Sequence, residues 1–292
     1  MWCIPRVGWC EVSEMTAPLA PLPRVSRVTA PDGVTLVVRE AGDPEGRPVV
    51  FIHGYCQAGL SWAAQMRDPA LAHLRLITFD LRGHGASDKP LAPDFYQEDA
   101  RWAGDLRALI DTLALVRPIL VGWSYGGRVI CDHLAAAGGA TIGGLVLVAA
   151  VASTQRAHYG TCNRLMFEMT SEDLGIAIPA TRSFLRKCYA VEPDPETFET
   201  ALAFNMMVPP QVRAAMAGRP ANFDAPLRAY GGPVLVVHGA EDQVIAPAMS
   251  HHILTLMPQA QLALFAGIGH TPFQEQPERF NALLADMAAR AS

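Results

Sequence analysis

The sequence predicts an α/β fold, with a mostly parallel, doubly wound sheet and an inserted helical cap. The first indication is a series of apolar runs that alternate with segments of helical periodicity. Near-continuous apolar strands are typical of a parallel sheet covered by helices on both faces. The second indication is one long stretch in which this alternation stops. The apolar runs are residues 49–52, 74–79, 119–121, 145–151, 234–237 and 262–265.

The chain before the first apolar run predicts a leader and a hairpin. Residues 1–14 are unlike the rest of the chain, and we expect a disordered leader over residues 1–23. Residues 24–30 and 34–42 then alternate apolar and polar side chains around Pro31-Asp32-Gly33. An Asp-Gly turn between alternating segments is a signal for a β-hairpin.

Two later segments have the spacing of amphipathic helices. Apolar residues recur every three or four positions from Trp102 to Leu113, and again from Phe280 to Met287. Pro277 is suited to the first turn of the second helix, because its fixed φ matches a helix and no amide is needed there. Both segments therefore predict helices that pack on the sheet.

The alternation stops between Val151 and Gly232. This stretch has no strand-like run, and its helical patterns are interrupted by prolines and are rich in Met and Phe. We interpret residues 152–229 as a helical cap inserted into a core formed by residues 24–151 and 230–292. Because ligands of open α/β sheets bind at the carboxyl ends of the strands, such a cap would cover the binding site.

Composition excludes several classes of function. The formal net charge is −5 and the basic residues are scattered, so we expect no nucleic-acid partner. No signal peptide and no apolar run of the ~18–20 residues that span a bilayer is present, so we expect no membrane association. The six cysteines lack metal-site spacing. We interpret them as reduced thiols of a cytoplasmic protein without a metal.

A candidate nucleophile lies in Gly122-Trp123-Ser124-Tyr125-Gly126, directly after a buried strand and before a helical segment. The glycines allow a sharp reversal that would hold Ser124 in a strained conformation, with its hydroxyl above the sheet. The helix that follows would aim its N-terminal amides at this hydroxyl. The strand–turn–helix context makes Ser124 the leading nucleophile.

A serine nucleophile needs a base, and the base needs an acid that fixes its tautomer. His270 follows the last predicted strand in a loop that contains Gly267 and Gly269, and Asp242 follows the strand at residues 234–237. We therefore expect Ser124, Asp242 and His270 at the same edge of the sheet. The tetrahedral oxyanion also needs two donors, for which the backbone amides of Tyr55 and Tyr125 are the candidates.

Other polar residues at strand ends are expected to be structural. His53, His84 and His238 each adjoin a glycine, but a single base is sufficient for the chemistry. Asp80 and Arg82 are expected to brace the loop after their strand. His251 and His252 are expected to be solvated on a surface helix.

These motifs together resemble the α/β-hydrolase superfamily, specifically its capped members. Beside the serine elbow, the resemblance rests on His53-Gly54, on the segment Phe79-Asp80-Leu81-Arg82-Gly83-His84-Gly85-Ala86-Ser87-Asp88, and on the loops of Asp242 and His270. It covers about residues 30–150 and 230–290, and it implies a Ser124–Asp242–His270 triad with Tyr55 and Tyr125 as oxyanion donors. The presence of Trp62 and Gln65 after the oxyanion loop resembles small esterases and cofactor-free haloperoxidases (perhydrolases). The related dehalogenases and epoxide hydrolases carry an aspartate nucleophile, and Ser124 argues against both.

The resemblance implies a cofactor-independent serine hydrolase that cleaves a small to medium, largely apolar carboxylic ester or lactone. Trp123, Phe204 and Met207 are the leading candidates for substrate contact. A carbon–carbon bond hydrolase, a perhydrolase and an acyltransferase remain alternatives on the same triad, and a receptor-like binding protein is the alternative from another class. Dimerisation through the cap is a further expectation.

Overall fold

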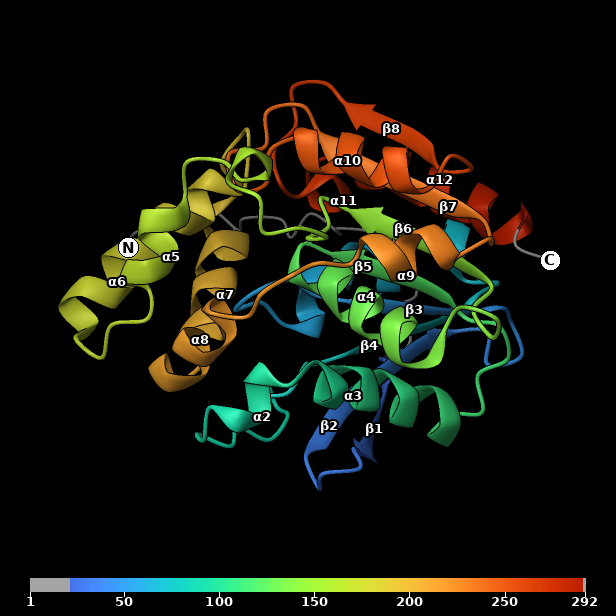
Figure 1. The fold of residues 1–292 in the computed structure, drawn as a ribbon, viewed down its shortest axis with the longest axis horizontal. Coiled ribbons are helices and arrows are strands. Elements are labelled where there is room, and N and C mark those ends of the chain that lie inside the picture. Colours follow the sequence, from blue (N-terminus) through green and yellow to red (C-terminus); the bar gives the residue numbers. More distant parts are fainter. Residues whose placement is uncertain (1–21, 291–292) are drawn as a thin grey trace, which may run out of the picture.

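The computed structural model describes residues 22–290 and contains an eight-stranded sheet in the order β1-β2-β4-β3-β5-β6-β7-β8 (Figure 1). Strand β2 runs antiparallel to β1 and β4, whereas the neighbouring pairs from β4 to β8 are parallel. The predicted mostly parallel sheet is confirmed. Residues 1–21 of the predicted leader lie outside the described residues.

The strands form where the apolar runs predict them. The hairpin consists of β1 (Arg24–Thr29) and β2 (Thr35–Gly42), and Gly33 in its turn has a φ of 87°. The run at residues 145–151 forms a shorter strand than its apolar length suggests, because the chain turns away from the sheet after Val148. The other strands are β3 (Pro48–Ile52), β4 (Arg75–Phe79), β5 (Ile119–Trp123), β6 (Gly144–Val148), β7 (Val234–Gly239) and β8 (Gln261–Phe265).

Helices cover both faces of the sheet, as the continuous apolar strands require. In β3 the side chains of Val50 and Ile52 join one apolar core, while Val49 and Phe51 join the other. The first core is completed by α3 (Asp99–Thr112), α4 (Tyr125–Ala137), α9 (Asp224–Ala229) and α10 (Ala248–Leu256). The second is completed by α1 (Ala63–Arg67), α11 (Pro272–Glu275) and α12 (Pro277–Arg290). Short elements are η1 (Gly59–Trp62), η2 (Pro69–Leu71), α2 (Asp94–Gln97) and η3 (Arg156–His158).

Between β6 and β7 the chain forms helices. The extended residues in this stretch pair through isolated β-bridges. Four of these helices gather at one end of the molecule (Figure 1), and we call them the helical insert. They are α5 (Asn163–Glu168), α6 (Leu174–Lys187), α7 (Pro195–Met206) and α8 (Pro210–Ala217). The predicted cap also included α9, but α9 lies beside α4 and its Leu227 belongs to the core.

The polar segment after β4 braces the loops at the edge of the sheet. The carboxylate of Asp80 accepts hydrogen bonds from the amides of Gly59 and Ala86, at 2.8 and 2.9 Å. The hydroxyl of Ser87 donates to the carbonyl of Asp80 at 2.6 Å and accepts from the amide of Val37 at 2.9 Å. These hydrogen bonds explain why polar residues occur in this segment without any contact with a substrate.

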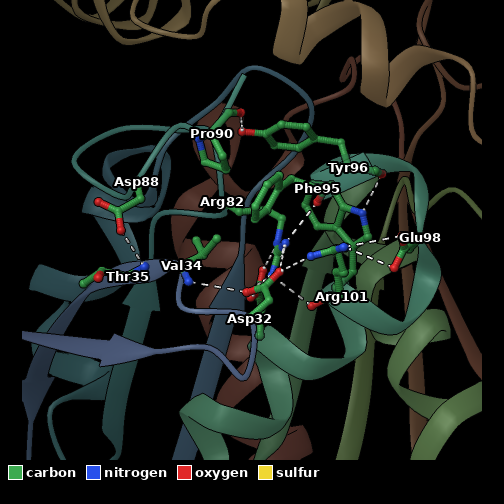
Figure 2. A network of polar contacts seen from close by, with 12 residues as sticks. Asp32, Val34, Thr35, Arg82, Asp88, Pro90, Phe95, Tyr96, Glu98 and Arg101 are labelled. Carbon is green, nitrogen blue, oxygen red and sulfur yellow. Dashed lines mark hydrogen bonds and ion pairs between the residues drawn. The ribbon is translucent and has the colours of Figure 1, made fainter. Parts of the chain in front are cut away.

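Arg82 is the centre of a second network, drawn in Figure 2. Its fully buried guanidinium donates to both oxygens of the buried Asp105, at 2.7 and 2.6 Å, and to Asp32 at 2.8 Å. It also donates to the carbonyls of Phe95 and Arg101. The predicted bracing role of Arg82 therefore agrees with these contacts, which tie the hairpin turn to α3.

Removing this cation should destabilise the fold strongly. Arg82→Met leaves the Asp105 carboxylate buried without its counter-ion, and we expect a loss of about 3–5 kcal/mol in the free energy of unfolding. Urea unfolding measures this value. Arg107→Met is the control, because its ion pair with Asp111 on the same helix has side chains that are 62% and 59% exposed. That pair should contribute ~0–1 kcal/mol. Equal losses in the two variants would contradict the prediction.

Candidate active site

Ser124 joins β5 to α4 in a strained turn. Its φ is 53° and its ψ is −114°, a conformation that costs a non-glycine residue roughly 1–3 kcal/mol. Hydrogen bonds hold the turn: the Ser124 amide donates to Val148 at 2.9 Å, and its carbonyl accepts from Gly127 and Val151 at 3.0 Å each. The neighbouring strand therefore stabilises the conformation that the pentapeptide predicts.

The elbow requires glycine because backbone segments approach closely there. A Cβ on Gly126 would collide with the carbonyl oxygen of Ile52 at the end of β3. A Cβ on Gly122 would lie 2.7 Å from the carbonyl oxygen of Gly126. The first helical turn of α4 is thereby packed directly against the sheet edge, beneath Ser124.

Asp242 and His270 form a buried hydrogen-bonded pair. His270 Nδ1 lies 2.7 Å from Asp242 Oδ2, and both side chains are almost fully buried. The other carboxylate oxygen of Asp242 accepts the amides of Val244 and Ile245, at 2.8 and 3.0 Å. A carboxylate accepts only, so Nδ1 of His270 carries the hydrogen and Nε2 is the basic nitrogen.

A second histidine contacts the same carboxylate. His238 Nε2 lies 3.1 Å from Asp242 Oδ2 and 2.9 Å from the carbonyl of Ile245, while its Nδ1 lies 2.6 Å from Ser250 Oγ. We expected only a structural role for His238, and its contact with Asp242 was missed. The spacing of four residues between them at the end of a strand was the available signal.

These contacts keep Asp242 ionised. Burial alone would raise the pKa of Asp242, but the charge of His270 and the hydrogen bonds from His238 and His270 lower it far below its usual value. The carboxylate therefore stays negatively charged well into the acid range. A permanent negative charge stabilises the imidazolium that forms when His270 takes up a proton.

The loops of Asp242 and His270 are packed together and against the elbow. A Cβ on Gly239 would collide with the carbonyl of Gly269, so these loops pass each other at backbone contact. The indole nitrogen of Trp123 donates to the carbonyl of His270 at 2.8 Å. The His270 amide in turn donates to the carbonyl of Cys188 at the end of α6, at 2.8 Å. The helical insert thus helps to hold the His270 loop.

The backbones of Tyr55 and Tyr125 lie at the same edge. Tyr125 opens α4, so its amide belongs to the first helical turn, whose amides lack acceptors within the helix. The loop of Tyr55 passes close to the serine, since a Cβ on Gly54 would be 3.2 Å from Ser124 Cβ. Both tyrosines line the same cavity as Ser124 and His270.

Two buried histidines support the loops beneath this site. His53 Nε2 accepts the amide of Leu81 at 3.0 Å, and its Nδ1 lies 2.9 Å from the carbonyl of Gly54. His84 Nδ1 lies 2.8 Å from the carbonyl of Arg82. Burial lowers the pKa of His53 to about 4 and the pKa of His84 to about 3.

A cavity of about 470 Å³ lies above Ser124. Its walls come from the elbow, from the β6–α5 connection and from the helical insert. Many of the residues that line it are apolar or aromatic, as a site for an apolar ligand requires. They include Trp123, Val151, Met166, Phe167, Phe184, Met216, Val244 and Ile245.

Two of the three residues expected to contact substrate lie elsewhere. Trp123 lines the cavity, but Phe204 packs in a separate cluster with Ala58 and Phe198. Met207 is 53% exposed at the end of α7 and does not line the cavity. Phe204 is kept from the cavity because α7 turns its buried apolar side chains toward α6 rather than toward Ser124.

Three arginines also line the cavity, and no sequence signal predicted them there. They are Arg128 on α4, Arg156 on η3 and Arg219 after α8. Arg219 pairs with Asp132 and Asp99, and Arg128 lies 3.8 Å from Asp99. Within the described part of the chain no carboxylate lines the cavity, so the charged groups along its wall are arginines.

The sheet order, the elbow at Ser124 and the loops that carry Asp242 and His270 are those of an α/β-hydrolase. The chain belongs to the alpha/beta hydrolase family, whose family model matches residues 49–283. Among curated relatives, the AB hydrolase superfamily protein YisY of Bacillus subtilis (strain 168) is 30% identical over 267 residues, 87% of this chain and 96% of that protein. A non-heme chloroperoxidase of Streptomyces lividans is 28% identical over 268 residues, 87% of this chain and 96% of that protein.

Solved structures of esterases are also similar to this chain over most of its length. A proposed aryl esterase from Burkholderia cenocepacia has a TM-score of 0.89 and 40% identity, covering 92% of this chain and 99% of that chain. The esterase RhEst1 from Rhodococcus sp. ECU1013 has a TM-score of 0.84 and 34% identity, with the same coverage of 92% and 99%.

Residues 22–290 contain no helix that is both long and apolar enough to cross a membrane. The same residues contain no group of three or more His, Cys, Asp or Glu side chains arranged to hold a metal ion.

The buried histidines make stability depend on pH. Their folded pKa values lie below the unfolded value of about 6.5, so the unfolded chain binds more protons as the pH falls. We expect the free energy of unfolding to decrease from about pH 6.5 toward pH 4, by up to ~1.4 kcal/mol per pH unit for each histidine. Urea unfolding at a series of pH values measures this slope.

His84→Asn is the matched variant, because an amide nitrogen can replace the Nδ1 donor without titrating. The slope should decrease by about one proton in this variant. Equal slopes in the wild type and His84→Asn would contradict the assignment of His84.

Proposed function

We propose that this protein is a cofactor-independent serine hydrolase that cleaves a small to medium, largely apolar carboxylic ester or lactone through an acyl-enzyme on Ser124. The observation that carries the proposal is the hydrogen-bonded Asp242–His270 pair, whose His270 lines the same cavity as the strained serine elbow. Hydrolase activity is also supported by the esterases among its structural relatives.

Acylation begins when Ser124 Oγ attacks the carbonyl carbon of the ester and His270 Nε2 takes the hydroxyl proton. The carbonyl oxygen becomes an oxyanion, for which the amides of Tyr55 and Tyr125 are the proposed donors. A donor of this kind lowers the barrier by roughly 2.7–4 kcal/mol. When the tetrahedral intermediate collapses, the C–O bond breaks and His270 donates its proton to the departing alkoxide.

Deacylation repeats these steps with water. His270 Nε2 removes a proton from water, the resulting hydroxide attacks the acyl carbon, and the bond to Ser124 Oγ breaks as His270 returns the proton to the serine. Asp242 holds the imidazole in one orientation and tautomer throughout, and His238 holds Asp242.

The helical insert is the proposed cap that selects the substrate. Met166, Phe167, Phe184 and Met216 come from this insert and line the cavity, so they offer an apolar wall to an acyl chain or an alcohol group. Arg156 also lines the cavity and is exposed, so it offers a cation to an oxygen-rich part of the substrate, whereas Arg128 and Arg219 already donate to protein groups. A largely apolar ester with one further polar group matches this lining.

Perhydrolysis is the second candidate, because non-heme chloroperoxidases are among the relatives over most of the chain. In this reaction hydrogen peroxide replaces water, so that the acyl-enzyme ester is converted into a peracid and free Ser124. Peracid formation from an ester in the presence of hydrogen peroxide, compared with the rate of hydrolysis, decides between the two reactions.

We also propose a reducing, cytoplasmic location. Cys56, Cys131, Cys162 and Cys188 are free and buried among the described residues. Buried free thiols are typical of a compartment in which disulfides do not form.

The first prediction of this proposal concerns the nucleophile. Ser124→Ala should abolish hydrolysis of p-nitrophenyl esters and labelling by a fluorophosphonate, because the acyl-enzyme is not formed. The thermal midpoint should stay nearly unchanged, because the substitution removes only one oxygen. Turnover retained by the variant would refute the role of Ser124, and a wild type with neither a burst nor labelling would favour a binding protein.

A second prediction separates cavity residues from core residues in the insert. Phe184 and Phe204 are both buried phenylalanines, but only Phe184 lines the cavity. Phe184→Leu should raise kcat/KM for long relative to short acyl esters by up to about tenfold, since a pocket discriminates one methylene by ~1–3 kcal/mol. Phe204→Leu is the control and should leave this ratio unchanged. The same shift in both variants would show that the insert acts only through its stability.

A further inference from the structure

The side chains of Tyr55 and Tyr125 end at α8 and at the segment that directly follows it. The hydroxyl of Tyr55 donates to the backbone carbonyl of Arg213 at 3.0 Å. The hydroxyl of Tyr125 accepts from Nη1 of Arg219 at 2.8 Å. Both tyrosines are buried, and their ring centroids are 6.5 Å apart. Each proposed oxyanion donor is therefore connected to α8 or to the segment that directly follows it.

Arg213 is a buried cation on α8 that joins the ends of α5 and α7 to the middle of α6. Its Nε donates to the carbonyl of Val208 at 2.9 Å, and its Nη2 donates to the carbonyl of Asn205 at 2.6 Å. Its Nη1 donates to the carbonyl of Met169 at 3.0 Å and to Thr181 Oγ1 at 3.3 Å.

The carbonyls at the C-terminal ends of α5 and α7 explain how this charge is tolerated. They have no partner within their helices and lie at the negative end of the helix dipole. The guanidinium of Arg213 satisfies them in place of a carboxylate. Because the carbonyl of the same residue accepts the Tyr55 hydroxyl, Tyr55 is attached to a point that joins three other helices of the insert.

Arg219 joins the end of the insert to the core. Its buried guanidinium donates to both oxygens of Asp132 on α4, at 2.9 Å each, and to Asp99 at the start of α3. It also lies 5.2 Å from the ring centroid of Trp102. Tyr125 is the residue that opens α4, so Arg219 contacts this helix through both Tyr125 and Asp132.

We propose that Arg213 and Arg219 are positioning residues that align the amides of Tyr55 and Tyr125, so that oxyanion stabilisation depends on the packed position of the insert. This inference rests on the proposed function of these amides. Its physical basis is the rigidity of tyrosine, whose ring transmits a fixed hydroxyl position to the backbone through only two rotatable bonds. Oxyanion donors act only within about 2.7–3.1 Å of the developing charge, so a small displacement of either tyrosine weakens catalysis.

Tyr55→Phe and Tyr125→Phe remove the two hydroxyl contacts and keep the rings. We expect each variant to lower kcat for a p-nitrophenyl ester by about tenfold, less than the ~10²–10³ seen when a donor is removed outright. KM should change by less than about twofold, because the ground-state carbonyl does not need the aligned amides. The inhibition constant of a trifluoromethyl ketone, which forms a tetrahedral oxyanion on serine, should rise by the same factor as kcat falls.

Tyr96→Phe is the matched control. Tyr96 is a fully buried tyrosine whose hydroxyl donates to the carbonyl of Pro90 at 2.6 Å, and it does not line the cavity. This variant should lower the thermal midpoint about as much as the other two, while kcat and inhibitor affinity stay within about twofold of the wild type.

A double-mutant cycle tests Arg219 directly. Arg219→Lys keeps a cation opposite Asp132 but lacks the planar fork that reaches Tyr125. Because both substitutions break the same contact, Arg219→Lys with Tyr125→Phe should lose no more kcat than the worse single variant.

The outcomes separate this inference from the proposed function. If the wild type hydrolyses esters and both tyrosine variants retain kcat and inhibitor affinity, the inference is overturned while the hydrolase assignment stands. Losses no larger than those of Tyr96→Phe, or multiplying losses in the cycle, would also overturn it. A wild type that neither cleaves esters nor labels at Ser124 would overturn both proposals.

Discussion

Parallel pairing of the strands from β4 to β8 is the constraint on which the rest of the molecule depends. It directs every loop that follows a strand to one edge of the sheet, so Ser124, Asp242 and His270 meet there although they are far apart in the chain. It also buries both faces of the strands, which explains their continuous apolar sequences. The collision that any side chain on Gly126 would make with β3 shows how closely the elbow depends on the sheet beneath it.

Three buried arginines brace different parts of the molecule. Arg82 pairs with the carboxylates of Asp105 and Asp32 within the core, Arg219 joins the segment after α8 to Asp132 and Asp99 of the core, and Arg213 donates to carbonyls at helix ends within the insert. Removing one partner of such a group is costly, because the remaining charge stays in a medium of low polarity. The insert is therefore attached to the core by contacts that define one position rather than by apolar packing alone.

Local sequence patterns predicted the sheet and the candidate nucleophile, base and acid, because each depends on a few consecutive residues. The Gly-x-Ser-x-Gly turn, the glycines before His270 and the strand before Asp242 are all short-range signals. Phe204 and Met207 were misplaced because periodicity indicates that a helix has an apolar face without indicating which neighbour that face contacts. The contacts of Arg213 and Arg219 with Tyr55 and Tyr125 involve folded surfaces that carry no such local signal, whereas the contact of His238 with Asp242 had only their four-residue spacing as a signal.

The sequence by itself determined the succession of strands and helices along the chain, the strained serine turn and the chemical types of the residues at the sheet edge. These features follow from apolar periodicity and from the few residues that a tight turn permits. Only the tertiary structure decided which side chains of the insert face Ser124 and which buried arginines hold the loops around it. The physical reason is that these choices depend on how whole helices pack and on where buried charges find partners, which involves residues as far apart in the chain as Tyr55 and Arg213, 158 positions from each other.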